Sequence, residues 1–253
     1  LTCASLVVAG DAAEDAVRRA RRLPGLGVGL HLTIYGARAA APGKSAVSPD
    51  GANLGYTPVA TGIAMMLTPS GRKAAKREVA AQFEAYRKTG LPLGHLDGHW
   101  HCHQHPALLA MAIELGKPLG LKAVRLAYEP FGFSRRVAGD RSLARLLNAI
   151  SHWPLSLEMR RQLRKAGIAC NDRFFGKVDD GFIDERLLTG LAAHLPGGVT
   201  EIGLHPATET WSGEHAPPPH WRQAVELAAL TSPTVREAIA DNGIELCRWS
   251  DIA

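Results

Sequence analysis

The chain has 253 residues and a mass of 27.1 kDa, of which 46% are hydrophobic and 21% charged. This composition excludes an intrinsically disordered chain, and the apolar runs are too short for a membrane-spanning helix. The net charge of +5 leaves nucleic acid, an anionic membrane surface or no particular partner as alternatives. The cysteines form no CxxC pair, which argues against a disulfide framework or a cysteine zinc cluster and favours a reducing, cytoplasmic setting.

The first predicted elements alternate between strand and helix. Residues 5–9 are β-branched and apolar, which predicts a buried strand. Residues 11–22 have early acidic and late basic side chains, which suits a helix dipole, and Asp11 is the expected N-cap. Residues 23–33 predict a turn and then a second strand that ends near His31.

The rest of the chain continues this alternation. Residues 36–60 and 207–220 are expected to form loops that cover a functional site. The other expected elements are a helix over 70–89, a strand over 95–99, a helix over 106–116, a strand over 121–127, helices over 141–166 and 184–194, a strand over 199–205, one or two helices over 221–242 and a strand over 244–249. This order predicts a parallel sheet covered by helices and, at this length, a single barrel domain over residues 1–253.

Five of the eleven histidines fall within residues 95–105, in the run HLDGHWHCHQH. Because alternate residues of a strand share a face, this run predicts a row of imidazoles with the carboxylate of Asp97, at least as far as His99 or His101. A core face would consist of Val, Ile or Leu, since buried imidazoles need hydrogen-bonding partners. The row therefore predicts a metal or catalytic site, and its donors suit Zn, Ni, Fe, Mn or Mg.

Two further histidines, His31 in VGLHLT and His205 in TEIGLHP, end predicted strands. The carboxyl ends of parallel barrel strands meet at one rim, so both are expected to join the histidine row. The alternative for each is a histidine that caps a strand or bonds a backbone carbonyl. Arg125, on the next strand, is expected either to bind an anionic or carbonyl group of a substrate or to pair with Asp97.

Residues 171–176 (NDRFFG) have two interpretations. They predict either a sugar-binding loop, with Asn171 and Asp172 as substrate ligands, or a segment that only packs two phenylalanines. Candidates for stacking on a sugar are Trp100, Trp211 and Trp221, with core packing as the alternative for Trp221.

The motifs VGLHLT, HLDGHWHCHQHP and TEIGLHPA together resemble the YdjC-like carbohydrate deacetylases, the ChbG family, and the resemblance runs along essentially the whole chain. NDRFFG and GVTEIGLHPAT are most similar to the hopanoid biosynthesis-associated HpnK subgroup. The resemblance implies a distorted TIM-like barrel and a divalent metal, Mg or Zn, held by His31, His99 and the Asp of an N-terminal ADDFG motif. It implies that His205 is the late active-site histidine, and that Asp97, His95 and His101 orient ligands or contact substrate.

The sequence contains no ADDFG motif. The resemblance therefore implies that the first barrel strand, with the metal-binding Asp and its neighbouring general base, is missing from residues 1–253. We expect these residues alone to bind metal weakly and to be inactive, because two histidines and water make a poor metal site.

For the intact protein, the resemblance implies metal-dependent hydrolysis of the amide of an N-acetylated amino sugar, with His205 protonating the leaving amine. Hydrogen bonds from Asp97 or His95 would orient the ligand imidazole. The substrate is either an N-acetylglucosaminyl hopanoid lipid or a chitooligosaccharide. The alternatives are another metal-dependent hydrolase, such as one acting on phosphate esters, and a non-enzymatic metal-binding or lipid-associated protein.

The basic charge is concentrated in one stretch. Residues 134–165 hold eight Arg or Lys residues against Asp140 and Glu158, together with several Leu residues and Trp153. This pattern indicates a helical segment at an anionic membrane surface rather than a nucleic-acid site, and a solvated helix face is the alternative. We therefore expect a cytoplasmic protein that binds peripherally to the inner membrane. A second copy of the chain, in a homodimer, is a further expected partner.

Overall fold

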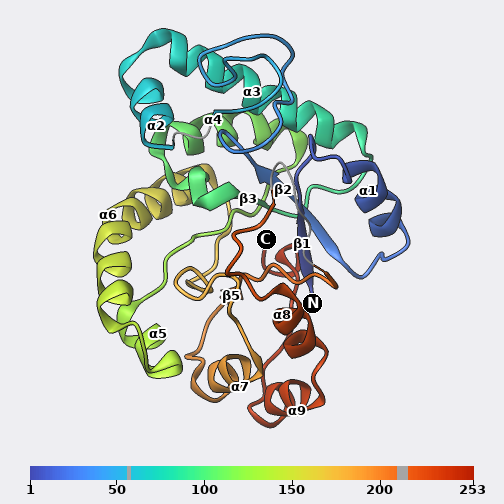
Figure 1. The fold of residues 1–253 in the computed structure, drawn as a ribbon, viewed down its shortest axis with the longest axis vertical. Helices are drawn as coiled ribbons and strands as arrows, with labels where there is room; N and C mark the ends of the chain where they lie inside the picture. Colours follow the sequence, from blue (N-terminus) through green and yellow to red (C-terminus); the bar gives the residue numbers. More distant parts are fainter. Residues whose placement is uncertain (56–57, 210–215) are drawn as a thin grey trace. The chain divides into compact units, whose positions relative to one another are not determined.

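A computed structural model describes residues 1–55, 58–209 and 216–253 (Figure 1). The chain divides into two compact units, each of which is described by itself. The first unit comprises Leu1–Arg125, Glu158–Cys170 and Cys247–Ala253, and the second comprises Leu126–Leu157 and Asn171–Leu246. None of the described helices is long and apolar enough to cross a membrane.

A three-stranded parallel sheet forms the centre of the first unit, in the order β1 (Cys3–Leu6), β2 (Gly27–Leu32) and β3 (Leu96–Gly98) (Figure 1). The register pairs His31 with Asp97. Because side chains alternate along a strand, the leucines at positions 30, 32 and 96 face the other side, where all three are fully buried. The register thus separates a polar face from the core.

Helices and short 3-10 turns complete the first unit. Helix α3 (Pro69–Lys88) contacts β2, and the hydroxyl of Tyr86 in this helix donates to the Val28 carbonyl at 2.9 Å. A second tie comes from Gln82, whose side-chain amide donates to the Thr33 carbonyl at 2.6 Å. The elements are α1 (Ala13–Arg21), α2 (Pro58–Leu67), α3 (Pro69–Lys88), η1 (His99–Gln104), α4 (Pro106–Gly116), η2 (Lys117–Leu119) and α10 (Trp249–Ile252).

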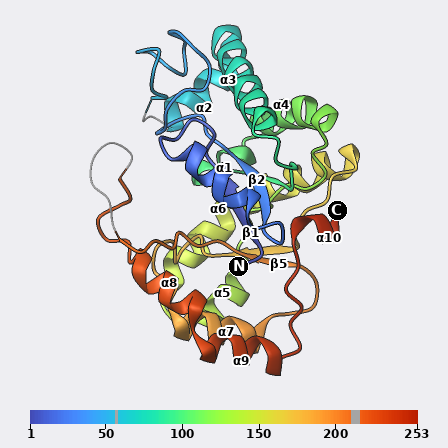
Figure 2. The same cartoon turned by 90° about the vertical axis from the view of Figure 1, so that its right-hand side faces the viewer.

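The second unit has a two-stranded parallel sheet, β4 (Arg173–Phe175) and β5 (Thr200–Ile202). Its core joins Phe175 of the sheet to Leu187, Leu191 and Val235 of the helices. Helices α7 and α9 lie side by side in both views (Figures 1 and 2). The helices are α5 (Phe131–Ala138), α6 (Ser142–Ala166, which continues into the first unit's segment), α7 (Glu185–His194), α8 (Gln223–Thr231) and α9 (Pro233–Asp241).

The mixed α/β class and the parallel strands are confirmed, whereas a closed barrel and the loss of its first strand stay predictions. The helices expected over 70–89, 106–116, 141–166 and 184–194 are found within a residue of those bounds. Two of these helices have a side-chain N-cap: Thr68 accepts from the Gly71 N–H, and Asp184 accepts from the Leu187 N–H.

Several local expectations are wrong. The buried strand expected over residues 5–9 is β1, which ends at Leu6 and has only Leu6 buried. Residues 244–249, all of which the structure describes, form no strand, and α10 begins at Trp249. Residues 121–127 make only isolated parallel bridges, at Ala123 and Val124. The N-cap of α1 is Ala12, because the helix begins later than expected, and the Asp11 carboxylate pairs instead with Arg38 at 2.9 Å.

Arg145 of α6 lies at the centre of a buried ionic network in the second unit. Its side chain is fully buried and pairs with Asp179 at 2.7 Å, Asp140 at 3.0 Å and Glu129 at 3.3 Å. Burial raises the pKa of Glu129 and lowers that of the neighbouring Lys177 to about 7. Although Arg145 belongs to the basic stretch of residues 134–165, its charge is neutralised inside the unit and does not reach the surface.

Replacing Arg145 with Met should destabilise the second unit by about 3–5 kcal/mol, because Asp179 and Glu129 would stay buried without their cation. Urea unfolding followed by circular dichroism measures the loss. The control is Arg136→Met, the same exchange at an exposed position of α5, which should move the unfolding midpoint far less. Equal shifts in the two variants would contradict a structural role for the network.

Candidate active site

Asp97 is the centre of a hydrogen-bonded cluster on the polar face of the first unit's sheet. Its Oδ1 lies 2.9 Å from His31 Nδ1, and its Oδ2 lies 2.6 Å from an Arg125 guanidinium nitrogen. Oδ2 also accepts a hydrogen bond from the Ser5 hydroxyl at 3.0 Å. The carboxylate is only 2% exposed, so it needs these donors to offset its loss of water.

The same contacts decide the charge of this carboxyl. Burial by itself would raise the pKa of Asp97, but the Arg125 charge and the His31 contact outweigh it and hold the pKa well below its usual range. Asp97 is therefore ionised at physiological pH. A carboxylate on Nδ1 orients the His31 ring and directs Nε2 toward any further ligand.

His95 belongs to the same cluster but lies inside the unit. Its Nε2 is 3.0 Å from the Ser5 hydroxyl, and its ring stacks on Trp249 with the centroids 5.6 Å apart. A Cβ at position 29 would lie 2.5 Å from this ring, so Gly29 of the VGLHLT motif is needed for the imidazole to pack on β2. His95 is 1% exposed, and its predicted contact with substrate stays a prediction.

The expected row of imidazoles does not continue past the strand. β3 ends at Gly98, and the backbone turns into the short helix η1. Trp100 and His101 adopt left-handed backbone, with φ of 46° and 57°, which costs a non-glycine residue about 1–3 kcal/mol. A Cβ at position 98 would lie 2.9 Å from His103 Nδ1, so this turn requires glycine. The prediction that these side chains share one strand face is therefore wrong beyond Asp97.

The turn places His99 beside His31. Their ring centroids are 5.9 Å apart at an interplanar angle of 77°. The Trp100 ring stacks on His99 with the centroids 5.4 Å apart, lies 5.8 Å from the Tyr35 ring and is 61% exposed. Two imidazoles therefore lie next to an exposed aromatic face, an arrangement that suits the binding of a sugar ring.

His103 has a structural environment. Its Nε2 donates to the Arg125 carbonyl at 2.9 Å, and burial lowers its pKa to about 3, so the ring is neutral. The ring of His101 is 6.2 Å from that of His103, centroid to centroid. The catalytic role expected for His101 stays a prediction.

The donors at His31 and His99 fit part of a divalent-metal site. Two imidazoles, one oriented by a carboxylate, are the ligands that Zn and similar ions accept. Within residues 1–55, 58–209 and 216–253, no group of three His, Cys, Asp or Glu side chains is placed to hold a metal ion. A metal bound by these two histidines therefore requires a further ligand.

His205, in the second unit, has its own carboxylate partner. Its Nδ1 lies 2.8 Å from Asp180 Oδ1, and its ring centroid is 4.5 Å from that of Trp221. Its backbone N–H donates to Glu226 at 2.6 Å, while burial raises the pKa of that carboxyl. A carboxylate on Nδ1 is typical of histidines that exchange protons through Nε2.

Ser5, Asp180 and Glu226 also belong to these contacts and were not predicted from the sequence. Ser5 and Glu226 stand in ordinary apolar or helical surroundings, and no motif spacing marks them. Asp180 had one usable signal, the paired aspartates of the VDDG run at residues 178–181.

Asn171 and Asp172, the two candidate substrate ligands in NDRFFG, both form hydrogen bonds to backbone groups. The buried Asn171 amide accepts from the Leu126 N–H at 2.7 Å and donates to the Leu126 carbonyl at 3.0 Å. Asp172 accepts from the Val199 N–H at 2.8 Å. Both phenylalanines of the motif are buried, as the packing alternative predicted, and the roles of Asn171 and Asp172 in substrate binding stay predictions. Trp211 lies outside the described residues.

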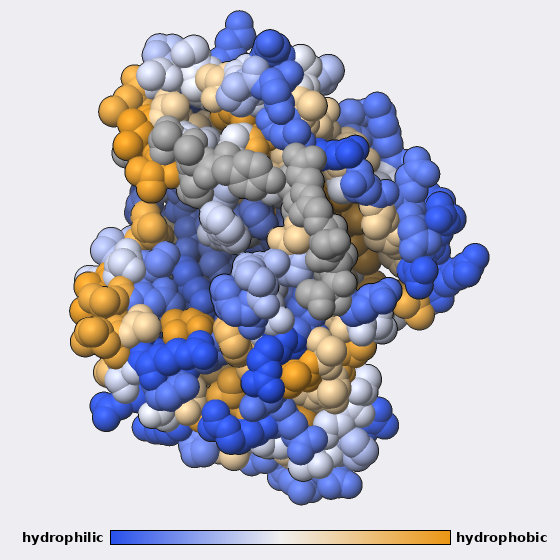
Figure 3. Space-filling model, in the orientation of Figure 1, coloured by the Kyte–Doolittle hydropathy of each residue, from blue (hydrophilic) through white to orange (hydrophobic). Residues whose placement is uncertain are grey.

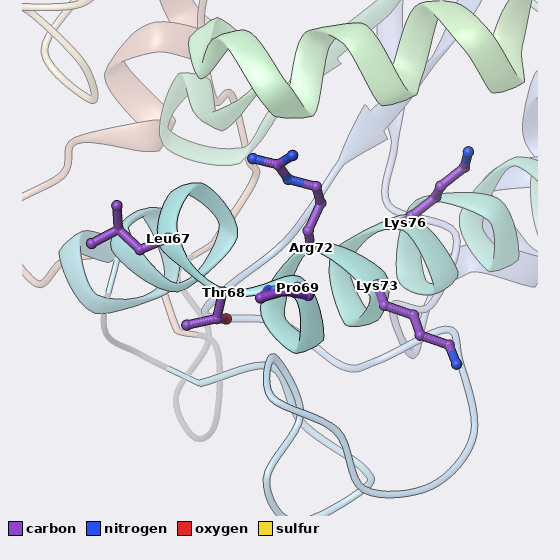
Figure 4. A pocket seen from close by; sticks show the side chains of 6 residues that line it. All are labelled: Leu67, Thr68, Pro69, Arg72, Lys73 and Lys76. Atoms are coloured by element: carbon purple, nitrogen blue, oxygen red, sulfur yellow. The ribbon is translucent and has the colours of Figure 1, made fainter.

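A pocket at the junction of α2 and α3 does not involve these histidines. Figure 4 shows Arg72 and Lys73 pointing to different sides of α3, and Lys76 forms an ion pair with Glu114 at 2.7 Å. Its polar groups do not converge on one ligand, so it carries no candidate site. The lining residues are Leu67, Thr68, Pro69, Arg72, Lys73 and Lys76.

Comparison with known proteins agrees with the motifs. Residues 1–241 match the family of YdjC-like proteins. The chain belongs to this family. A mouse carbohydrate deacetylase is 30% identical over 281 aligned residues, which cover 100% of this chain and 86% of the mouse protein. A carbohydrate deacetylase of Geobacillus stearothermophilus is 26% identical and covers 99% of this chain and 86% of its own length.

The fold of this YdjC-like chain also has a solved counterpart. A crystal structure of an Enterococcus faecalis protein, described as a cellobiose-phosphate cleavage protein, matches with a TM-score of 0.71 at 20% identity. The match covers 99% of this chain and 87% of that protein. At this identity the likeness shows the fold alone.

Replacing Asp97 with Asn should destabilise the first unit by about 3–5 kcal/mol at neutral pH, because the nearly buried Arg125 loses its counter-charge. The pKa of Asp97 is lowered by folding, so its contribution is complete above the ordinary carboxyl value of 3.8 and decreases as the pH falls below it. Urea unfolding at pH 7 and at lower pH should therefore show a difference that shrinks in acid.

The matched control is Asp11→Asn, which breaks the exposed pair with Arg38 and should change stability far less. A difference between wild-type protein and Asp97→Asn that is the same at every pH would contradict the role given to the carboxylate charge.

Proposed function

We propose that this protein hydrolyses the amide of an N-acetylated amino sugar and releases acetate and the free amine. Membership of the YdjC-like family and full-length similarity to proteins named carbohydrate deacetylases support this reaction. The observation that carries it is the Asp97–His31 pair beside His99, with the exposed ring of Trp100 next to them.

The proposed substrate is an N-acetylglucosaminyl hopanoid lipid, because NDRFFG and GVTEIGLHPAT resemble the HpnK subgroup most. A chitooligosaccharide is the alternative substrate. Peripheral contact of residues 134–165 with an anionic membrane belongs to the lipid proposal, since the enzyme would then meet its substrate at a bilayer.

We also propose a divalent metal, Mg or Zn, held by His31, His99 and a third protein ligand. Such an ion, held by these residues, would act as a Lewis acid toward the acetamide carbonyl and would lower the pKa of a bound water. Asp97 serves this arrangement by holding His31 through Nδ1. The resemblance implies that this third ligand is the Asp of an ADDFG motif, which residues 1–253 do not contain.

The reaction requires a proton donor as well as an attacking water. Water oxygen bonds to the acetyl carbon as a water proton passes to a general base, which the resemblance places beside the ADDFG aspartate. The carbon–nitrogen bond then breaks, and the amine nitrogen takes up a proton. We assign this donation to His205, because Asp180 holds Nδ1 and leaves the transfer to Nε2. The other proposed substrate contacts, which all have protein partners already, are Arg125, His95, Asn171 and Asp172.

Replacing His99 with Ala should abolish most acetate release and weaken metal binding together, because one of two imidazole ligands is lost. Replacing His205 with Gln should instead lower kcat by about 10²–10⁴-fold and leave metal binding unchanged, as expected for a lost general acid. Acetate release and zinc titration by calorimetry measure the two effects. His194→Ala, at the exposed end of α7, is the control.

The assay uses the gene product expressed from its own start codon, since residues 1–253 need not be the whole protein. It compares an N-acetylglucosaminyl lipid, a chitooligosaccharide and a phosphate ester. Acetate from the lipid supports the proposal as stated, and acetate only from the oligosaccharide selects the alternative substrate. Phosphate release without acetate, or an active His99→Ala variant with full metal content, would refute the deacetylase assignment.

Replacing Trp100 with Ala should raise KM about three- to tenfold with little change in kcat, because the exposed ring stacks on the sugar without touching the reacting atoms. Trp100→Phe keeps an aromatic face and should restore most of the affinity. Steady-state kinetics of acetate release from the N-acetylated substrate measure both variants. An unchanged KM in Trp100→Ala would show that the ring does not contact the sugar.

A further inference from the structure

Helix α6 has an inner face that the core already covers. Its buried residues recur at helical spacing of three, four or seven positions, which is the pattern of one side of a helix. They are Arg145, Ala149, Ser156, Met159 and Leu163, none more than 7% exposed. The packing of α6 is therefore accounted for without its outer face.

The outer face of the same helix is also apolar. Six large side chains follow helical spacing and form one stripe, roughly 21 Å long at 1.5 Å per residue. Figure 3 shows apolar residues along the left edge of the view, where Figure 1 draws α6. The stripe consists of Leu143 (69% exposed), Leu146 (37%), Leu147 (57%), Ile150 (61%), Trp153 (54%) and Leu157 (48%).

Single exposed apolar side chains are ordinary on a protein surface, whereas six on one helix face indicate an interaction surface. Because the solvent-exposed face of α6 is apolar, the helix does not show the polar outer face of an ordinary surface helix. Exposing this apolar outer face to water costs free energy, and the packing of the helix in the fold does not explain why that cost is accepted.

The exposed charges beyond the C-terminal end of the stripe are mostly basic. Residues 141–157 contain no Asp or Glu. The spacing of the stripe continues beyond Leu157 into Arg161, Arg164 and Lys165, all exposed. Glu158 is the one acidic residue of α6, and it pairs with Arg161 at 2.7 Å.

We propose that this stripe docks on the surface of an anionic lipid bilayer. Interfacial helices combine a Leu- and Trp-bearing face with flanking Arg and Lys, and each cation near the bilayer is attracted by anionic headgroups. A second copy of this chain would bring like-charged surfaces together, so the charge pattern favours lipid over self-association. The stripe is the part of residues 134–165 that would contact the bilayer in which the proposed lipid substrate lies. This proposal therefore rests on the lipid substrate of the proposed function.

The experiment is sedimentation of the gene product with vesicles of phosphatidylcholine, alone or mixed with phosphatidylglycerol. We expect binding to the mixed vesicles at low salt, little binding to the neutral ones, and weaker binding as salt screens the charges. The double variant Leu147→Glu and Ile150→Glu should lose at least tenfold in vesicle affinity. Its thermal unfolding should stay unchanged, because both side chains are more than half exposed.

Two controls separate this proposal from the others. Leu246→Glu adds one negative charge, against two in the stripe variant, at an apolar position of the second unit that is 61% exposed, and it should bind vesicles like wild-type protein. His99→Ala should also bind like wild-type protein, since docking does not require hydrolysis. Vesicle binding without acetate release would therefore support the docking surface while refuting the deacetylase.

Wild-type protein that stays in the supernatant with mixed vesicles at low salt would overturn the proposal. Equal vesicle affinity of the stripe variant and wild-type protein would overturn it as well, because the contact would lie elsewhere. A wild-type dimer that the stripe variant converts to monomer, measured by light scattering without lipid, would show that a second copy covers the stripe and would also overturn it.

Discussion

The buried carboxylate of Asp97 is the constraint on which the first unit's site depends. Ser5 from β1, His31 from β2 and Arg125 each meet it from a different segment, within 3.0 Å. A carboxylate removed from water must be met by donors, so its burial determines where these segments lie. The contact that offsets the desolvation of Asp97 also orients the His31 ring, so stability and ligand geometry depend on the same atoms.

In the second unit, two adjacent aspartates connect the buried ionic network to the proposed proton donor. Asp179 pairs with the buried Arg145, and Asp180 pairs with His205. Because the first pair lies inside the unit, it holds the backbone that carries the second. The position of the proposed proton donor therefore depends on an ion pair that takes no part in the reaction.

Helix α6 shows how one element can serve a core and a surface together. Composition alone identified a basic stretch with Leu and Trp, but it counted Arg145 as a surface charge. The structure buries Arg145 and exposes the face that carries Leu147 and Ile150. Because the stripe is acid-free and ends in cations, its chemistry matches a bilayer surface.

The sequence by itself determined the α/β class, most helix bounds and the concentration of chemistry in HLDGHWHCHQH, because periodicity, caps and motif spacing are local properties. Only the tertiary structure decided that Arg125 pairs with Asp97, and that Ser5 reaches this carboxylate across 92 positions of chain. It also decided that the backbone turns left-handed at Trp100 and ends the expected row of imidazoles. These outcomes depend on the desolvation of side chains by distant segments, and local spacing contains no information about that burial.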